Sequence, residues 1–195
     1  MTTDVHTLSS MKTHYNEDLT IKDIDKEVTL AGWVSAVRDL GGIIFIELRD
    51  KSGFFQVVAD PQINPKVHEV FSKLKDEYVI QVKGKITKRP PETYNPDLAT
   101  GEIEMYPKEV KIFSEAKLLP FDLSSDDTKE DIRLKYRYLD IRRPQMANNL
   151  KLRHKIVTAI RSYLNNCEFT EVETPILINT TPEGARDYLV PSRVQ

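Results

Sequence analysis

The sequence predicts a chain in two parts: a mainly β first part, built as a closed barrel of five strands with one short helix, and an α+β second part. In residues 27–113, apolar and polar side chains alternate in short runs separated by turn residues, which is the pattern of strands with one buried face. In residues 151–177, a helical apolar stripe is followed by a β-favouring run. We expect the barrel and an N-terminal extension in residues 1–120, a linker or hinge in 121–140, and the second part in 141–195.

The first three strands are expected in the runs 27–38, 43–49 and 54–59. Within each run, apolar residues recur at every second position, which places them on one face of a strand. The two connecting segments are short and contain glycine, as is typical of tight turns between antiparallel strands. These runs therefore predict a three-stranded meander.

Residues 65–75 interrupt the alternation with apolar residues at helical spacing, and they begin with a proline, which suits the first position of a helix. Alternation returns in residues 78–89 and 102–113, which are separated by a loop rich in proline, asparagine and glycine. Three strands, a helix and two strands within about 90 residues match the five-stranded oligonucleotide-binding (OB) barrel.

The second and third strands of this barrel class form its nucleic-acid surface. If the apolar isoleucines of residues 43–49 face the core, Phe45 lies on the opposite face, beside Gln56 of the next strand and near Arg38 and Asp39 at the adjoining turn. An aromatic ring there can stack on a base, and an amide can read a base edge. The alternative is that Phe45 belongs to the core and the faces are reversed, and periodicity alone leaves both interpretations open.

The second part is expected to begin with a long amphipathic helix. Residues 151–167 carry an apolar stripe that includes Ile156 and Ile160, and such a stripe favours packing of the helix on a sheet. Residues 168–177 follow with β-favouring side chains and a proline, Pro175. Central strands avoid proline, so a strand at a sheet edge or at an interface is expected here.

Charge is distributed unevenly although the net charge is only −2. Residues 122–131 contain five acids and one lysine, whereas residues 133–161 contain nine lysines and arginines and one acid. The basic stretch could meet phosphates, but a solvated helix surface explains the charge equally simply. A net charge near zero argues against a protein that coats nucleic acid through its whole surface.

Other features of the sequence limit the classes of protein to which the chain can belong. The chain contains no apolar run of the roughly 18 residues that a membrane span needs, and its first residues lack the apolar block of a secretory signal. Its single cysteine excludes an internal disulfide and agrees with a reducing compartment. We therefore expect a cytoplasmic protein without membrane contact. His14, His68 and His154 show no spacing typical of metal ligands, so no metal site is expected.

Three stretches together resemble a known family. The run FTEVETPIL, after a long helix, resembles motif 1 of class II aminoacyl-tRNA synthetases, and RLKYRYLDIRRPQMANNLKLR followed by TPEGARDYLVPSR resembles the bacterial-type aspartyl-tRNA synthetases. The resemblance extends from about Val28 to the last residue. One departure is Glu168, where the family usually has a glycine that ends the helix. Motifs 2 and 3 of the family are expected beyond Gln195, so the chain is expected to be the amino-terminal piece of a longer enzyme.

The resemblance implies an activity for that longer enzyme. The family activates L-aspartate with ATP and Mg²⁺ to aspartyl-adenylate, and then transfers the aspartyl group to the 3′ end of tRNA(Asp). By the same resemblance, the second part is the start of an antiparallel α/β catalytic domain, Glu183 helps to hold the ammonium group of aspartate, and Pro175 lies in a homodimer interface. No catalytic residue is assigned with certainty, and the chain alone is expected to be inactive and to bind no cofactor.

For the barrel, the resemblance favours the outer position of Phe45 and implies an anticodon-binding domain. The anticodon-contacting positions of the family match the following residues: Arg38, Asp39, Phe45, Gln56 and Glu104. The alternative function is a free-standing OB module that binds nucleic acid without catalysis. A reading frame that continues into motifs 2 and 3 would exclude this alternative.

Overall fold

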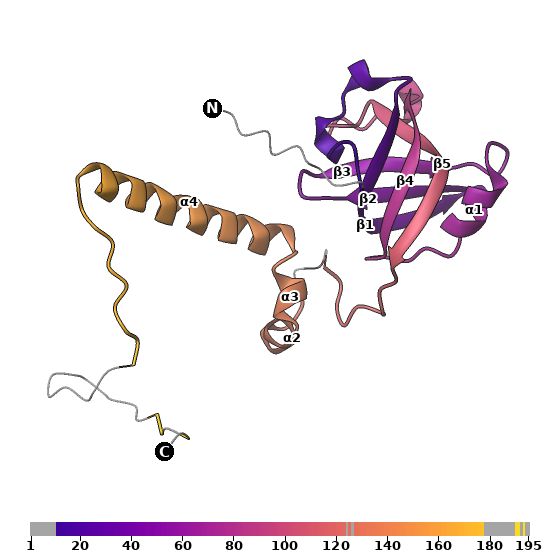
Figure 1. Ribbon diagram of the computed structural model, residues 1–195. Coiled ribbons are helices and arrows are strands. Elements are labelled where there is room, and N and C mark those ends of the chain that lie inside the picture. Colours follow the sequence, from indigo (N-terminus) through magenta and orange to yellow (C-terminus); the bar gives the residue numbers. More distant parts are fainter. Residues whose placement is uncertain (1–10, 124, 126, 178–189, 192, 194–195) are drawn as a thin grey trace, which may run out of the picture. The chain divides into compact units, whose positions relative to one another are not determined.

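The structure is a computed structural model, and it describes residues 11–177 except 124 and 126, together with 190, 191 and 193 (Figure 1). The chain divides into two compact units, Met1–Leu119 and Pro120–Gln195. Each unit is described by itself.

The first unit is a barrel of five strands. The strands are β1 (Glu27–Leu40), β2 (Ile43–Arg49), β3 (Phe54–Ala59), β4 (Val79–Lys88) and β5 (Ile103–Ser114). They close in the order β1-β2-β3-β5-β4, with all pairs antiparallel except β3 and β5. Helix α1 (Pro65–Phe71) lies between β3 and β4 in the chain, and single-turn 3₁₀ helices lie at Asn16–Asp18, Ile21–Asp23 and Pro91–Thr93. The predicted five-stranded barrel of the OB type is confirmed.

The length of β1 allows the sheet to curl into a barrel. Residues 27–33 pair with β4, and residues 33–40 pair with β2, so one strand joins two parts of the sheet. Gly32 lies at this changeover, where a Cβ atom would come within 2.3 Å of the carbonyl oxygen of Arg49. The backbone can approach so closely because glycine has no side chain.

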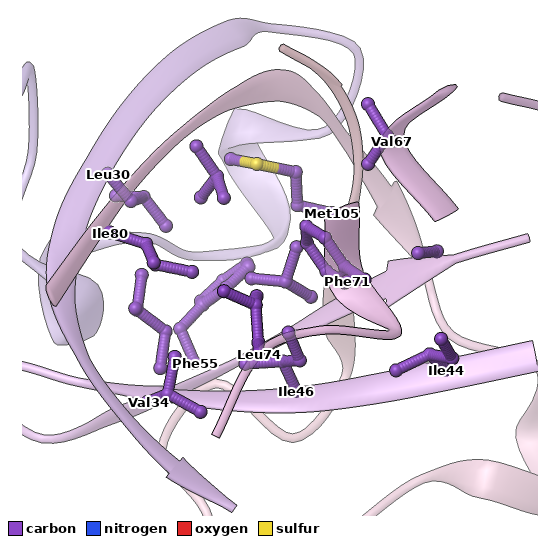
Figure 2. Close-up of a cluster of buried hydrophobic side chains, with 14 of the residues drawn as sticks. Leu30, Val34, Ile44, Ile46, Phe55, Val67, Phe71, Leu74, Ile80 and Met105 are labelled. Carbon is purple, nitrogen blue, oxygen red and sulfur yellow. The ribbon is translucent and has the colours of Figure 1, made fainter. Parts of the chain in front are cut away.

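The core fills the interior of the barrel and holds α1 against it (Figure 2). Ile44, Ile46 and Leu48 are at most 3% exposed, so they form the inner face of β2, as the alternation predicts. Phe55 on β3 is fully buried opposite Leu48. From α1, Phe71 also enters the core. Burial of these side chains is the main term that stabilises the barrel.

The N-terminal extension is tied to the turn between β2 and β3. The fully buried Asn16 donates from Nδ2 to the carbonyl oxygens of Leu48, at 2.8 Å, and Gly53, at 3.0 Å. Asp50 accepts a hydrogen bond from Lys12 Nζ at 2.9 Å. Burial alone would raise the pKa of Asp50, but hydrogen bonds from Ser52 and Lys12 outweigh it and lower that pKa. The charged carboxylate therefore fixes the extension to the barrel.

The second unit contains three helices: α2 (Glu130–Lys135), α3 (Arg137–Asp140) and α4 (Pro144–Asn166). The first two lie within the segment expected to be a linker. The Asp140 carboxylate at the end of α3 is fully buried and pairs with Arg137 and Arg143. Helix α4 begins seven residues before the expected start, with a proline at its first position, where the missing N–H leaves no hydrogen bond unmade.

The strand expected after α4 does not form, because residues 168–177 have no regular secondary structure. A strand requires a neighbour that satisfies its backbone N–H and C=O groups, and the described part of the second unit contains no strand. The expected packing of α4 on a sheet fails for the same reason. Its apolar stripe is open instead, with Leu152 57% exposed and Ile160 55% exposed.

Glu168 ends α4 in the conformation usually taken by glycine. Its φ angle is +64°, and its N–H donates to the carbonyl of Asn165 at 3.0 Å, while that of Phe169 donates to Leu164 at 3.0 Å. These two bonds make a Schellman motif. The helix therefore ends as it would with glycine, although a left-handed residue with a Cβ atom costs about 1–2 kcal/mol.

Candidate nucleic-acid interface

Phe45 lies on the outer face of β2. It is partly exposed, between the buried Ile44 and Ile46. In the register of the sheet it stands opposite Arg38 of β1 on one side and Val58 of β3 on the other. The alternative interpretation, in which Phe45 belongs to the core, is therefore wrong. The ring is placed where a base could stack on it, beside an exposed guanidinium group.

Gln56 and Glu104 meet on the same outer face. Gln56 Nε2 donates to Glu104 Oε2 at 2.8 Å, although the two residues are 48 positions apart in the chain. The parallel pairing of β3 with β5, at Val57 and Met105, brings them together. Glu47 stands opposite Gln56 in the β2–β3 register. The result is a row of hydrogen-bonding groups across three strands, next to Phe45.

Asp39 and Arg38 lie at the end of β1, where the chain turns into β2. Gly41 and Gly42 have φ angles of +66° and +88°, as a two-residue turn of the I′ type requires. The Asp39 carboxylate accepts a hydrogen bond from the Gly42 N–H at 3.0 Å. Asp39 therefore holds the turn in addition to lying beside the interface.

Arg89, which local periodicity does not single out, is buried directly after the end of β4, with only 5% exposed. Its Nε donates to the carbonyl of Ile103 at 3.0 Å, and its buried Nη2 has no hydrogen-bond partner in the structure. Burial lowers the pKa of Arg89, while the charges of Glu104 and Glu47 oppose that shift. The guanidinium remains protonated and balances the two carboxylates of the row.

Tyr106 lies beside Glu104 on β5. Burial, followed by the negative charge of Glu104 and a hydrogen bond to it, raises the pKa of Tyr106 to about 12. The phenol therefore keeps its proton at physiological pH, and its O–H donates a hydrogen bond to the Glu104 carboxylate. Glu104, which is 3% exposed, is held in place by the amide of Gln56 and by this phenol.

Together these groups offer what base recognition needs. Phe45 offers an aromatic face, and the partly exposed Gln56 and Glu47 offer an amide and a carboxylate that can match donors and acceptors on base edges. The buried Glu104 and Arg89 lie behind them, where Glu104 accepts the hydrogen bond of Gln56. Arg38 adds an exposed positive charge suited to a phosphate. Four of the residues selected from the sequence, Arg38, Phe45, Gln56 and Glu104, are thus brought to the outer face of the barrel. Asp39, which pairs with the inward-facing Ile44, lies at the adjoining turn, and the geometry adds Glu47, Arg89 and Tyr106.

The other selected residues lie in the second unit. Glu183 falls outside the described residues. Pro175 lies in the irregular segment after α4. Next to that segment, a groove of about 420 Å³ is lined by the apolar stripe of α4, including Ile160 and Leu164, and by Phe169. Arg161 forms a bidentate ion pair with Glu171, with Nη2 2.7 Å from Oε1, and this pair fixes the start of the segment against α4.

Two family models match the chain. Residues 28–113 match the "OB-fold nucleic acid binding domain", and residues 129–195 match "tRNA synthetases class II (D, K and N)". The aspartate–tRNA(Asp/Asn) ligase of Thermosynechococcus vestitus is 51% identical over 189 residues, which are 94% of this chain and 31% of that protein. The chain belongs to the aspartate–tRNA ligase family.

Further relatives agree with this assignment. The aspartate–tRNA ligase of Geobacillus kaustophilus is 50% identical over 184 residues, which again cover 94% of this chain and 31% of that protein. The chain thus spans about a third of the length of the curated relatives that it matches. Among solved structures, the asparaginyl-tRNA synthetase of Pyrococcus horikoshii with asparaginyl-adenylate is 25% identical with a TM-score of 0.77, and the match covers 91% of this chain and 39% of that one. The family's barrel and the start of its synthetase domain are both present.

In the part of the chain that the structure describes, no group of three or more His, Cys, Asp and Glu side chains is arranged to hold a metal ion. Over the same residues, no helix is both long and apolar enough to cross a lipid bilayer.

Proposed function

We propose that this chain supplies the anticodon-binding domain and the beginning of the catalytic domain of an enzyme that attaches L-aspartate to tRNA(Asp). The observation that carries the proposal is a cluster of side chains on the outer face of a barrel of the aspartate–tRNA ligase family. This outer-face cluster consists of Phe45, Arg38, Gln56 and Glu104. Its aromatic, amide, carboxylate and guanidinium groups have the chemistry that reads unpaired bases. An anticodon loop presents such bases.

The reaction belongs to the longer protein that includes this chain. The aspartate carboxylate would attack the α-phosphate of ATP, forming aspartyl-adenylate and releasing pyrophosphate, and magnesium would neutralise phosphate charge during that step. The aspartyl group would then pass to the terminal adenosine of the tRNA with release of AMP. We propose that this reaction serves protein synthesis in the cytoplasm. Glu183 is proposed to hold the substrate ammonium group. It stands in a segment punctuated by proline and glycine, which suits a loop that closes over a substrate.

The second candidate is a free-standing OB module that binds RNA without catalysis. The same outer-face cluster would serve it equally well. The two candidates differ in what residues 129–195 do, and the match of these residues to class II synthetases favours the enzyme.

Aspartate-dependent exchange of pyrophosphate into ATP tests the enzymatic assignment. We expect no exchange above background with the 195-residue chain, because the family's motifs 2 and 3, which hold ATP and magnesium, are not among these residues. A longer protein that contains this chain should catalyse the exchange with aspartate and not with asparagine or lysine. Appreciable exchange by the 195-residue chain would contradict the proposal that the reaction requires the longer protein.

We also propose that the enzyme is a homodimer, with Pro175 in the interface. The open apolar stripe of α4 and the adjoining groove support this proposal, because an exposed apolar patch of this kind marks an interaction surface. Sedimentation equilibrium of the longer protein should give twice the chain mass. Replacing Ile160 with aspartate should shift it toward the monomer, whereas the same change at the nearby Thr158 should have a smaller effect. A monomeric wild type at micromolar concentration would contradict the proposal.

A further inference from the structure

Helix α1 is held to the barrel at fixed points near the candidate interface. Val67 and Phe71 are 4% and 0% exposed and anchor the helix in the core (Figure 2). Asn64, before its first turn, accepts a hydrogen bond from the Val67 N–H at 3.2 Å and donates from Nδ2 to the Lys108 carbonyl on β5 at 3.2 Å. A short helix anchored in this way gives its side chains defined positions.

From this helix, His68 reaches the turn between β1 and β2. Its Nε2 lies 2.9 Å from the carbonyl oxygen of Gly42. A carbonyl oxygen can only accept a hydrogen bond, so Nε2 carries the proton in this contact, in the neutral ring as well as in the charged one. Asp39 accepts a hydrogen bond from the N–H of Gly42. The backbone N–H and C=O of Gly42 are therefore both hydrogen-bonded, the first to Asp39 and the second to His68 of α1.

The turn needs such an anchor. Gly41 and Gly42 both have positive φ angles, and glycine has more accessible backbone conformations than any other residue. Leu40 at the tip is 63% exposed, so packing does little to restrain the turn. Without a second contact, Arg38 and Asp39 would stand next to a flexible turn of two glycines. The entropy cost of ordering this turn when RNA binds would then lower the affinity for RNA.

We propose that His68 is a positioning residue: by donating to the Gly42 carbonyl, it orders the β1–β2 turn and presents Arg38 and Asp39 to RNA. The inference rests on the proposed function of the barrel. It assigns to α1 a part in RNA binding, although α1 contributes no base-contacting residue to the outer-face cluster.

Three variants of the 195-residue chain test this role, with the transcribed anticodon stem-loop of tRNA(Asp) as the probe. His68→Ala should weaken binding about three-fold to ten-fold, the scale of one hydrogen bond. His68→Gln should restore affinity to within about two-fold, because the glutamine amide nitrogen can take the place of Nε2 as a donor. Glu69→Ala is the matched control on α1, since the Glu69 side chain is exposed and forms an ion pair with Lys73 on the same helix. This variant should bind as the wild type does.

Hydrogen exchange gives a readout independent of RNA. The amide of Gly42 should exchange faster in His68→Ala and return toward the wild-type rate in His68→Gln. If His68→Ala binds as the wild type does while Phe45→Ala weakens binding, the positioning role is overturned and the anticodon function stands. If alanine and glutamine weaken binding equally, the donor role is overturned. If Phe45→Ala has no effect on affinity, the proposed function fails, and this inference fails with it.

Discussion

Replacing Phe55 with alanine should lower the free energy of unfolding of the barrel by about 3–5 kcal/mol, the cost of removing a fully buried phenylalanine from a packed core. Phe55 has no exposed surface and faces Leu48 across the β2–β3 pair. The loss combines the hydrophobic transfer of the ring with the cavity that remains. Urea unfolding followed through the single tryptophan, Trp33 of β1, measures it.

The neighbouring Phe54 provides the control for this prediction. It is one residue away on the same strand and partly exposed on the outer face. Phe54→Ala should cost no more than about half as much, because less of its apolar surface leaves water on folding. Equal losses for the two variants, or a loss below about 1 kcal/mol for Phe55→Ala, would mean that Phe55 does not fill the core as described.

The same difference between faces explains how much of the fold could be predicted from the sequence. Alternation in β2 and in the other strands reflects a local rule, since successive side chains point to opposite sides. The strand count followed from that rule, and the position of α1 followed from the change to helical spacing after Pro65. Which side is the core depends on pairing between distant residues, and Phe45 is as apolar as its neighbours, so periodicity could not decide between the two faces.

Two parts of the site illustrate the same limit. Gln56 and Glu104 are joined by the parallel β3–β5 pair, and a contact across 48 residues leaves no trace in local periodicity. Arg89 directly follows β4, just before two prolines, and its sequence position suggests a surface charge. Its burial depends on contacts with distant residues such as Ile103, to whose carbonyl it donates. Outside the site, the contact of His68 with Gly42 spans 26 positions and is equally invisible to local periodicity.

Residues 168–177 do not form the expected strand, for a related physical reason. Its composition favours extended backbone, but propensity in strands mostly reflects packing against neighbours, and the described part of the second unit offers no strand to pair with. The start of α4, by contrast, has a local signal, because Pro144 suits the first position of a helix. Residues 145–149 lack apolar side chains at helical spacing, so periodicity places the start at residue 151.

Replacing Phe45 with alanine should weaken binding of the tRNA(Asp) anticodon stem-loop by about 1–3 kcal/mol, or roughly five-fold to 150-fold in Kd, the usual effect of removing an aromatic ring on which a base stacks. Because the ring lies on the outer face, the melting temperature should change far less than in Phe55→Ala. Fluorescence anisotropy with a labelled stem-loop measures the first quantity, and circular dichroism measures the second.

Phe113 gives a matched control for this variant. It is also on the barrel surface, 39% exposed, with Lys111 Nζ 5.3 Å from its ring centre. It lies nine residues beyond Glu104 on β5, about 30 Å along an extended strand. Phe113→Ala should therefore leave the affinity for the stem-loop unchanged, and Phe45→Trp should preserve it by keeping an aromatic face.

If Phe45→Ala binds normally while Phe113→Ala does not, RNA contacts a different side of the barrel. That result would remove the main support for anticodon recognition by the cluster of Phe45, Gln56 and Glu104, because the cluster would then be ordinary polar packing around a buried arginine.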